Sequence, residues 1–121
     1  TLKGTVKKFV DDDPEFDLPQ GLIDLYESKD FGPYADDDGY MPVNFLTNND
    51  ITGGNSGSPV LNGKGELIGL AFDGNIEAMA GDVIFDNKLQ KTINVDIRYV
   101  LFLIDKYAGA KHIVDEMTVI K

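Results

Sequence analysis

The chain has 121 residues, of which 42% are hydrophobic, and it carries a formal net charge of −10 at pH 7 and no cysteine. This size predicts one compact unit over residues 1–121, and no apolar run approaches the ~20 residues that a membrane-spanning helix needs. The negative charge excludes nucleic-acid binding, because it repels phosphate, and the lack of cysteine excludes disulfides and thiolate metal sites.

The first segment, residues 2–10, has Val6, Phe9 and Val10 among threonine and lysine residues, which predicts a strand with one solvent-exposed face. An acidic run around a proline follows at residues 11–17. A calcium loop would need oxygen ligands at alternating positions, a glycine at its sharp turn and a closing glutamate, and this run has neither the glycine nor that spacing. We therefore interpret residues 11–17 as a solvated acidic loop.

A short helix is predicted over residues 18–29, with Pro19 near its start and Asp17 available as its cap. Residues 30–40 then form a long loop with a second acidic cluster at 36–38. Loops of this length are often functional, but these residues indicate no particular ligand.

The middle of the chain predicts strands. A strand over residues 41–47 leads into a small-residue loop, and a hairpin follows, with strands at 60–61 and 66–72 around the turn Asn62-Gly63-Lys64-Gly65. Residues 72–75 then break the pattern with turn residues.

A further strand pair is predicted at residues 82–85 and 88–95. The period then changes, and residues 96–107 have apolar positions at helical spacing before Gly109 interrupts them. About six strands and a C-terminal helix predict a mainly β fold, a single Greek-key barrel closed by a helix.

The loop Thr52-Gly53-Gly54-Asn55-Ser56-Gly57-Ser58-Pro59 carries the candidate chemistry. Its glycines reach backbone angles that let amide groups converge on one spot, where they can hold an oxyanion, and Ser56 is the candidate nucleophile. The rival G-x-S-x-G elbow of α/β-hydrolases requires glycine where this chain has Ser58, and a helix where it has a hairpin. The competing structural interpretation is an ordinary turn between two strands.

The order Gly-Asn-Ser-Gly-Ser-Pro resembles the nucleophile loop of chymotrypsin-like serine peptidases. The resemblance is closer to the bacterial dipeptidyl-peptidase 7 and 11 family, and it runs over essentially all 121 residues. The segments that carry it are Phe45 to Val60, Gly69 to Asn75, Val95 to Val100 and Asp105 to Ala110, together with Asp30-Phe31-Gly32 and Tyr34-Ala35-Asp36.

The resemblance implies a serine dipeptidyl aminopeptidase with a two-barrel chymotrypsin-like fold, of which this chain is the C-terminal six-stranded barrel. It implies that Ser56 is the acylating serine and that the Gly54 and Ser56 amides are oxyanion donors. Asp73 matches the acidic residue that holds the free α-amino group of the substrate. Gly74 matches the position where acid-selective members carry arginine, and glycine there implies a hydrophobic P1 residue. Without the family match, Asp73-Gly74-Asn75 would be interpreted as an Asx-type turn.

A serine needs a neighbouring base, and the only histidine, His112, lies 56 residues downstream in the helical C-terminal part, where we interpret it as a partly exposed helical residue. The family brings its histidine and aspartate from the other barrel. We therefore expect the chain to be a piece of a longer peptidase, inactive by itself.

The expected partners are oligopeptides with a free N-terminus, and no cofactor or metal is expected. The family also implies a homodimer located in the bacterial periplasm, at the cell surface or outside the cell. The alternative function is a non-catalytic barrel that binds peptides or a partner, with the acidic loops 11–17 and 36–38 as contact surface.

Overall fold

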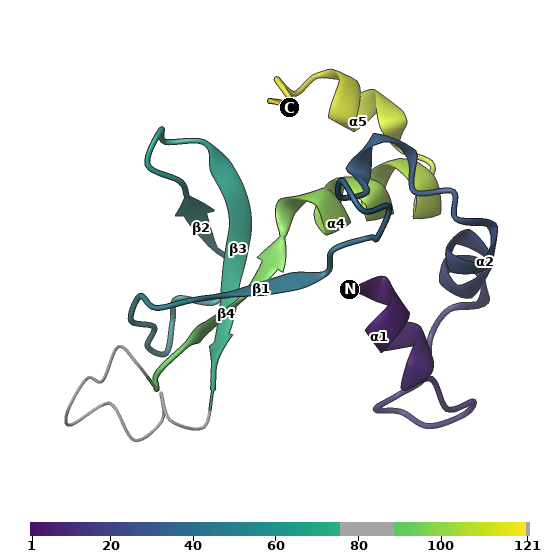
Figure 1. Cartoon of the computed structure of the whole chain (residues 1–121), viewed down its shortest axis with the longest axis horizontal. Coiled ribbons are helices and arrows are strands. Elements are labelled where there is room, and N and C mark those ends of the chain that lie inside the picture. The colour runs from purple at the N-terminus through teal and green to yellow at the C-terminus, as the bar shows by residue number, and fades with distance from the viewer. Residues whose placement is uncertain (76–88, 121) are drawn as a thin grey trace. The chain divides into compact units, whose positions relative to one another are not determined.

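The computed structural model describes residues 1–75 and 89–120. Where the sequence predicts one compact unit, the contacts divide the chain into two (Figure 1). We call them the helical unit, Thr1–Pro42 with Arg98–Lys121, and the sheet unit, Val43–Ile97.

The helical unit begins with a helix where the sequence predicts a strand. Helix α1 spans Leu2–Lys7, so the prediction of a strand over residues 2–10 is wrong. Leu2 and Val6 are four residues apart, which places them on one face of a helix, and Leu2 is fully buried. The Leu2 amide donates a hydrogen bond of 2.8 Å to the Met41 carbonyl oxygen, which fixes the start of the helix.

The predicted early helix is confirmed as α2, Gln20–Ser28, which buries Leu22 and Ile23. Its cap is not the predicted Asp17: the N-cap residue is Pro19, and no side chain caps the helix. Proline suits this position because its fixed φ leads into a helix and it has no amide that needs a partner. A short 3-10 helix, η1 (Gly32–Tyr34), lies within the predicted 30–40 loop.

The C-terminal part of the helical unit contains α4 (Ile97–Phe102), the π-helical turn η2 (Leu103–Tyr107) and α5 (Lys111–Asp115). The helix predicted over residues 96–107 is therefore present but changes to a π-turn half-way. Phe102 is fully buried and lies 6.1 Å from the Phe31 ring in an edge-to-face arrangement. The buried hydrophobic residues of this unit are Leu2, Leu22, Ile23, Phe31, Tyr34, Met41, Leu101, Phe102 and Val114.

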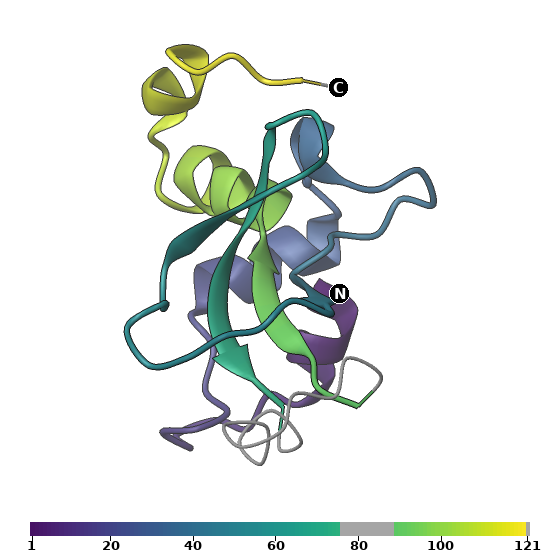
Figure 2. The same ribbon diagram turned by 90° about the vertical axis from the view of Figure 1, so that its left-hand side faces the viewer.

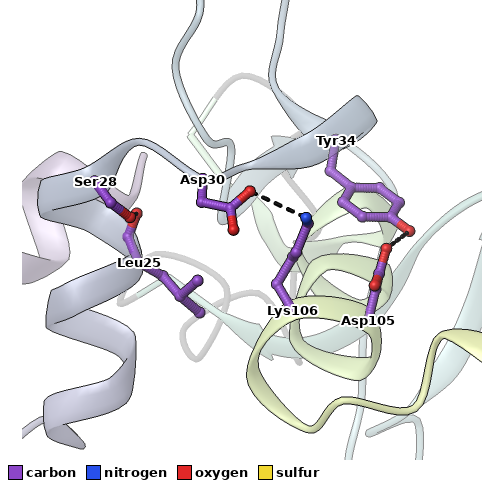
Figure 3. A network of polar contacts seen from close by, with 6 residues as sticks. All are labelled: Leu25, Ser28, Asp30, Tyr34, Asp105 and Lys106. Atoms are coloured by element: carbon purple, nitrogen blue, oxygen red, sulfur yellow. Dashed lines mark hydrogen bonds and ion pairs between the residues drawn. The ribbon is translucent and has the colours of Figure 1, made fainter.

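Two polar contacts connect η2 to the segment around η1 (Figure 3). The Tyr34 hydroxyl donates a hydrogen bond of 2.7 Å to Asp105 Oδ2, and Lys106 Nζ lies 3.0 Å from Asp30 Oδ1. Burial and the Asp105 carboxylate together raise the pKa of Tyr34 to about 12. Both partners on η2 are consecutive residues, so the π-turn presents adjacent side chains to one segment.

The sheet unit contains four antiparallel strands in the order β1-β4-β3-β2 (Figure 2). Strand β4 is central, and it pairs with β1 on one side and with β3 on the other. The strand bounds are β1 Asn44–Thr47, β2 Ser58–Leu61, β3 Leu67–Gly74 and β4 Thr92–Asp96.

The predicted hairpin is confirmed as β2 and β3. Asn62 closes its turn: the Asn62 Oδ1 atom accepts hydrogen bonds of 2.9 Å from the Lys64 amide and 3.0 Å from the Glu66 amide. Further along β3, Gly69 lies so close to β4 that a Cβ atom there would meet the Val95 carbonyl oxygen at 2.6 Å. Only glycine allows this approach of the two strands.

The regular register between β3 and β4 breaks between Ala71 and Asp73, so Phe72 is a bulged residue. Before the bulge the side chain of Ala71 is buried, whereas Phe72 and Asp73 are both exposed in succession. A bulge inserts one unpaired residue and redirects the side chains that follow it. It therefore places two neighbouring side chains of β3 on accessible positions.

The predicted mainly β, six-stranded closed barrel is not what the described residues form. They combine helices with four strands, and β1 and β2, at the two edges of the sheet, are not paired with each other. The loss of the first predicted strand to α1 accounts for part of the difference. The strand predicted at 82–85 lies outside the described residues.

Candidate active site

The candidate nucleophile loop is a tight turn between β1 and β2. The Asn55 side chain folds it: Asn55 Oδ1 accepts hydrogen bonds from the Thr52 amide at 2.9 Å and the Thr52 hydroxyl at 3.1 Å. Gly54 and Gly57 have φ values of +93° and +84°, which side-chain-bearing residues rarely adopt. The glycines that the sequence places here are thus required by the backbone.

Ser56 lies exposed at the end of this turn. Its hydroxyl donates a hydrogen bond of 3.3 Å to the carbonyl oxygen of Phe72 on β3. The next amide, that of Gly57, donates a bond of 2.6 Å to the Ala71 carbonyl oxygen. The loop is therefore anchored to β3 immediately after the serine, and the hydroxyl remains accessible to solvent.

The amides of Gly54 and Ser56 make no hydrogen bond within residues 1–75 and 89–120, although both residues are exposed. The neighbouring Gly57 amide, in contrast, is occupied by its contact with β3. Two exposed donors, one residue apart and near a serine hydroxyl, have the chemistry of an anion-binding turn.

Asp73 and Gly74 lie at the end of β3, directly after the bulge. The Gly74 amide donates a hydrogen bond of 2.8 Å to Asp73 Oδ1. An Asx turn would instead use the Asn75 amide, which donates to the Lys91 carbonyl oxygen. The Asp73 side chain is exposed. One carboxylate oxygen is thus oriented by the backbone, and the carboxylate as a whole remains accessible to a cation.

Phe72 is the residue that sequence reasoning missed. Its carbonyl oxygen accepts the serine hydrogen bond, and its side chain is 47% exposed, which is unusual for a phenylalanine in a sheet. Periodicity gives no signal for a bulge, and the run Leu70-Ala71-Phe72 reads as a regular strand. The glycine and aspartate that follow were the only sign that the strand ends nearby.

The remaining candidates lie elsewhere. His112 is exposed in α5 of the helical unit. In the two acidic loops, Asp13 Oδ1 accepts a hydrogen bond from the Glu15 amide, and Asp36 Oδ1 accepts bonds from the Asp38 and Tyr40 amides. These are local turn contacts. Across the described ranges, no three His, Cys, Asp or Glu side chains come together as a metal site would require.

The helical unit has an open groove of about 420 Å³ between α2 and η2. Leu25, Ser28 and Lys106, all drawn in Figure 3, lie along it. The groove contains none of the predicted site residues. We also find no helix among the described residues that is long and apolar enough to span a membrane.

The sequence profile of peptidase S46 matches residues 1–119 of the chain. The chain belongs to the peptidase S46 family. A dipeptidyl-peptidase 7 of Capnocytophaga gingivalis is 71% identical over 121 residues, which is 100% of this chain and 17% of that protein. An Asp/Glu-specific dipeptidyl-peptidase of the same organism is 55% identical, again over 100% of this chain and 17% of that protein.

The fold of this S46 chain is also found in solved structures. The crystal structure of Porphyromonas endodontalis DPP11 in complex with substrate matches with a TM-score of 0.93 and 48% identity, over 96% of this chain and 17% of that one. The resemblance to the dipeptidyl-peptidase 7 and 11 family is thereby confirmed, and the chain spans 17% of the length of these S46 relatives.

Proposed function

We propose that this chain supplies the acylating serine of a dipeptidyl peptidase that releases dipeptides from the free N-terminus of oligopeptides. The observation that carries the proposal is the exposed Ser56 hydroxyl beside the Gly54 and Ser56 amides, which donate no hydrogen bond within the described residues. The relatives named dipeptidyl-peptidase 7 and Asp/Glu-specific dipeptidyl-peptidase support the reaction class.

In the proposed reaction, a base removes the proton of Ser56 Oγ as that oxygen attacks the carbonyl carbon of the second substrate residue. The developing oxyanion accepts hydrogen bonds from the Gly54 and Ser56 amides, where a donor contributes about 3 to 4 kcal/mol to transition-state stabilisation. Collapse of the tetrahedral intermediate breaks the peptide bond, and the leaving amine takes up the proton. Water then hydrolyses the acyl-enzyme and releases the dipeptide.

The base belongs to polypeptide beyond these 121 residues. His112, the only histidine, is exposed in a short helix of the other unit, and the family resemblance assigns it no role. Removing the base from a comparable serine protease costs about a million-fold in kcat, so the 121 residues alone should have no measurable turnover.

Asp73 binds the substrate ammonium in this proposal. Its exposed carboxylate is held by the Gly74 amide at 2.8 Å, so little reorganisation is needed when the ammonium arrives. Gly74 places no charge and no bulk beside the second substrate residue, which favours an apolar side chain there. Selectivity among apolar side chains should be loose, because one methylene changes binding by only about 1 to 3 kcal/mol.

We propose further that the sheet unit is part of a chymotrypsin-like barrel, residues 1–121 being one portion of a larger peptidase domain. Several of its apolar side chains are exposed by 45 to 60%, which fits a face that the longer enzyme covers. These residues are Leu46, Leu61, Leu67, Phe72 and Leu89. By family resemblance, the whole enzyme is a homodimer of the bacterial periplasm, cell surface or exterior.

The test is Ser56→Ala in the full-length protein, assayed with dipeptidyl reporter substrates that carry an apolar second residue. We expect turnover to fall to background while the thermal midpoint stays within about a degree, because an exposed side chain is changed. Ser58→Ala is the matched control, since Ser58 lies two residues away in β2, and it should keep most of the activity. An active Ser56→Ala protein would exclude the peptidase function and favour a binding module.

A further inference from the structure

Asn75, the first residue after β3, makes three hydrogen bonds to the segment that precedes β4. Its backbone amide donates to the Lys91 carbonyl oxygen at 3.0 Å. Its side-chain Nδ2 donates to the Leu89 carbonyl oxygen at 2.8 Å, and its Oδ1 accepts from the Lys91 amide at 3.0 Å. One side chain thus contacts two backbone groups on the neighbouring segment.

The position of Asn75 explains this pattern. The pairs Asp73 with Ile93 and Gly74 with Thr92 place Asn75 opposite Lys91 in the antiparallel register. In a regular ladder, residues that face each other in this way exchange two backbone hydrogen bonds. Here the Asn75 amide makes the first, and its side-chain Oδ1 replaces the backbone carbonyl in the second. The sheet contact therefore continues by one residue through the Asn75 backbone amide and side chain.

These contacts lie directly beyond the end of β3. The bulge at Phe72 interrupts the ladder, so only the pairs of Asp73 and Gly74 lie between the bulge and Asn75. Asp73 and Gly74 are the proposed contacts of the substrate ammonium and of the second substrate residue. Loss of the Asn75 side chain would remove two of the bonds that hold the chain directly after this two-residue segment.

We propose that Asn75 is a positioning residue of the substrate subsite: it holds the end of β3 in the place where Asp73 and Gly74 meet the substrate. This inference rests on the proposed peptidase function. Since Asn75 acts through its neighbours, its loss should weaken substrate binding more than the chemical step at Ser56.

The experiment compares Asn75→Ala, Asn75→Asp and Asn62→Ala in the full-length protein, with a dipeptidyl reporter substrate that has an apolar second residue. Asn62 is the matched control, because its side chain also bonds backbone amides at a turn, but at the opposite end of β3. We expect Asn75→Ala to raise KM by about tenfold with a smaller change in kcat, and Asn62→Ala to leave KM unchanged.

In Asn75→Asp, lost positioning and added charge change KM in opposite directions, so the two effects can be told apart. This variant also serves if Asn75→Ala does not fold. Aspartate keeps the acceptor for the Lys91 amide but loses the donor to the Leu89 carbonyl oxygen. Its added negative charge near Asp73 would by itself strengthen ammonium binding and lower KM. A raised KM therefore reports lost positioning.

An unchanged KM in folded Asn75→Ala, a lowered KM in Asn75→Asp, or equal changes in Asn75→Ala and Asn62→Ala would overturn the positioning role. These outcomes differ from failure of the proposed function, in which the unmodified protein does not hydrolyse the substrate or Ser56→Ala still does. The latter results would overturn both.

Discussion

The amide of Gly57 and the carbonyl oxygen of Ala71 are joined by a hydrogen bond of 2.6 Å, which attaches the serine loop to β3. This contact occupies the Gly57 amide, whereas the amides of Thr52, Asn55 and Ser58 are bonded within the loop. It also places the Ser56 hydroxyl beside the bulged residue Phe72, at 3.3 Å from its carbonyl oxygen. The candidate nucleophile and the candidate ammonium site are thus parts of one local structure.

Substitution of Gly57 tests the backbone of this loop. A Cβ atom at Gly57 would meet no atom within 4 Å, but the φ of +84° is unfavourable for any residue with a side chain. We expect Gly57→Ala to cost about 1 to 2 kcal/mol in stability through backbone strain and to lower kcat. Gly53→Ala is the control, because Gly53 also has open space and no positive φ. If Gly57→Ala and Gly53→Ala have the same kcat, the positive φ of Gly57 is not needed to position Ser56.

Gly69 provides a test of packing rather than of backbone angle. A Cβ atom there would lie 2.6 Å from the Val95 carbonyl oxygen and 2.7 Å from the Phe45 ring. We expect Gly69→Ala to separate β3 from β4 and to destabilise the sheet unit by about 1 to 3 kcal/mol, measured as a lower thermal midpoint. Gly63→Ala, in the open turn of the hairpin, should change the midpoint little. A midpoint for Gly69→Ala as high as that of the unmodified protein would contradict the close approach.

Gly74 tests the proposed substrate preference. An arginine at this position can form a charge-assisted pair with an acidic side chain of the substrate. We therefore expect Gly74→Arg to raise kcat/KM for substrates with Asp or Glu as the second residue and to lower it for apolar ones. Gly63→Arg adds the same charge at the far end of β3 and should leave the ratio of the two rates unchanged. If the ratio of kcat/KM for acidic and apolar substrates does not change in Gly74→Arg, residue 74 does not contact the second substrate residue.

Tyr34 and Asp105 form a part-buried hydrogen bond of 2.7 Å in the helical unit, and a double-mutant cycle can measure it. We expect Tyr34→Phe and Asp105→Asn to be coupled by about 1.5 to 3 kcal/mol, since the hydrogen bond involves a charged acceptor. Activity should change little if Ser56 and the end of β3 form the site. Additive effects of the two substitutions would show that the contact contributes nothing to stability.

The same pair predicts a loss of stability at high pH. The pKa of Tyr34 is raised by burial and by Asp105 to about 12 in the folded protein, above its ordinary value of 10.0. The native state therefore keeps its proton where the unfolded chain loses it, so stability is fully present below pH 10 and falls as the pH rises toward 12. Unfolding midpoints of the unmodified protein and Tyr34→Phe should converge over this range. A constant difference between them would contradict the raised pKa.

Local signals in the sequence were sufficient for α2, the β2–β3 hairpin and the serine loop. In each case glycine, proline or asparagine stands at a position where only a few backbone angles are possible. Strand β1 was also predicted, although it begins at Asn44 rather than at residue 41.

The failures have a common physical origin. The segment of α1 contains β-branched residues that favour a strand, but the burial of Leu2 and its bond to Met41 favour a helix. The bulge at Phe72 and the π-turn at Leu103–Tyr107 also depend on partners far along the chain. For α1 the spacing of Leu2 and Val6 was a local signal, whereas no pattern within a short window indicates the bulge or the π-turn.

The bulge also divides β3 into two stretches with opposite tolerance to mutation. Upstream of it, the odd-numbered positions Gly69 and Ala71 face the interior, so only small residues should survive selection there. Downstream, the odd-numbered Asp73 is accessible, so we expect its negative charge to be constrained there and its side-chain volume to matter less. Without the extra residue Phe72, Asp73 would follow Ala71 directly and stay on the accessible face, because it already pairs with Ile93, the neighbour of the Ala71 partner Asn94. What the extra residue adds is a second exposed side chain and the carbonyl oxygen that meets Ser56, so the length of this strand is constrained as well as its composition.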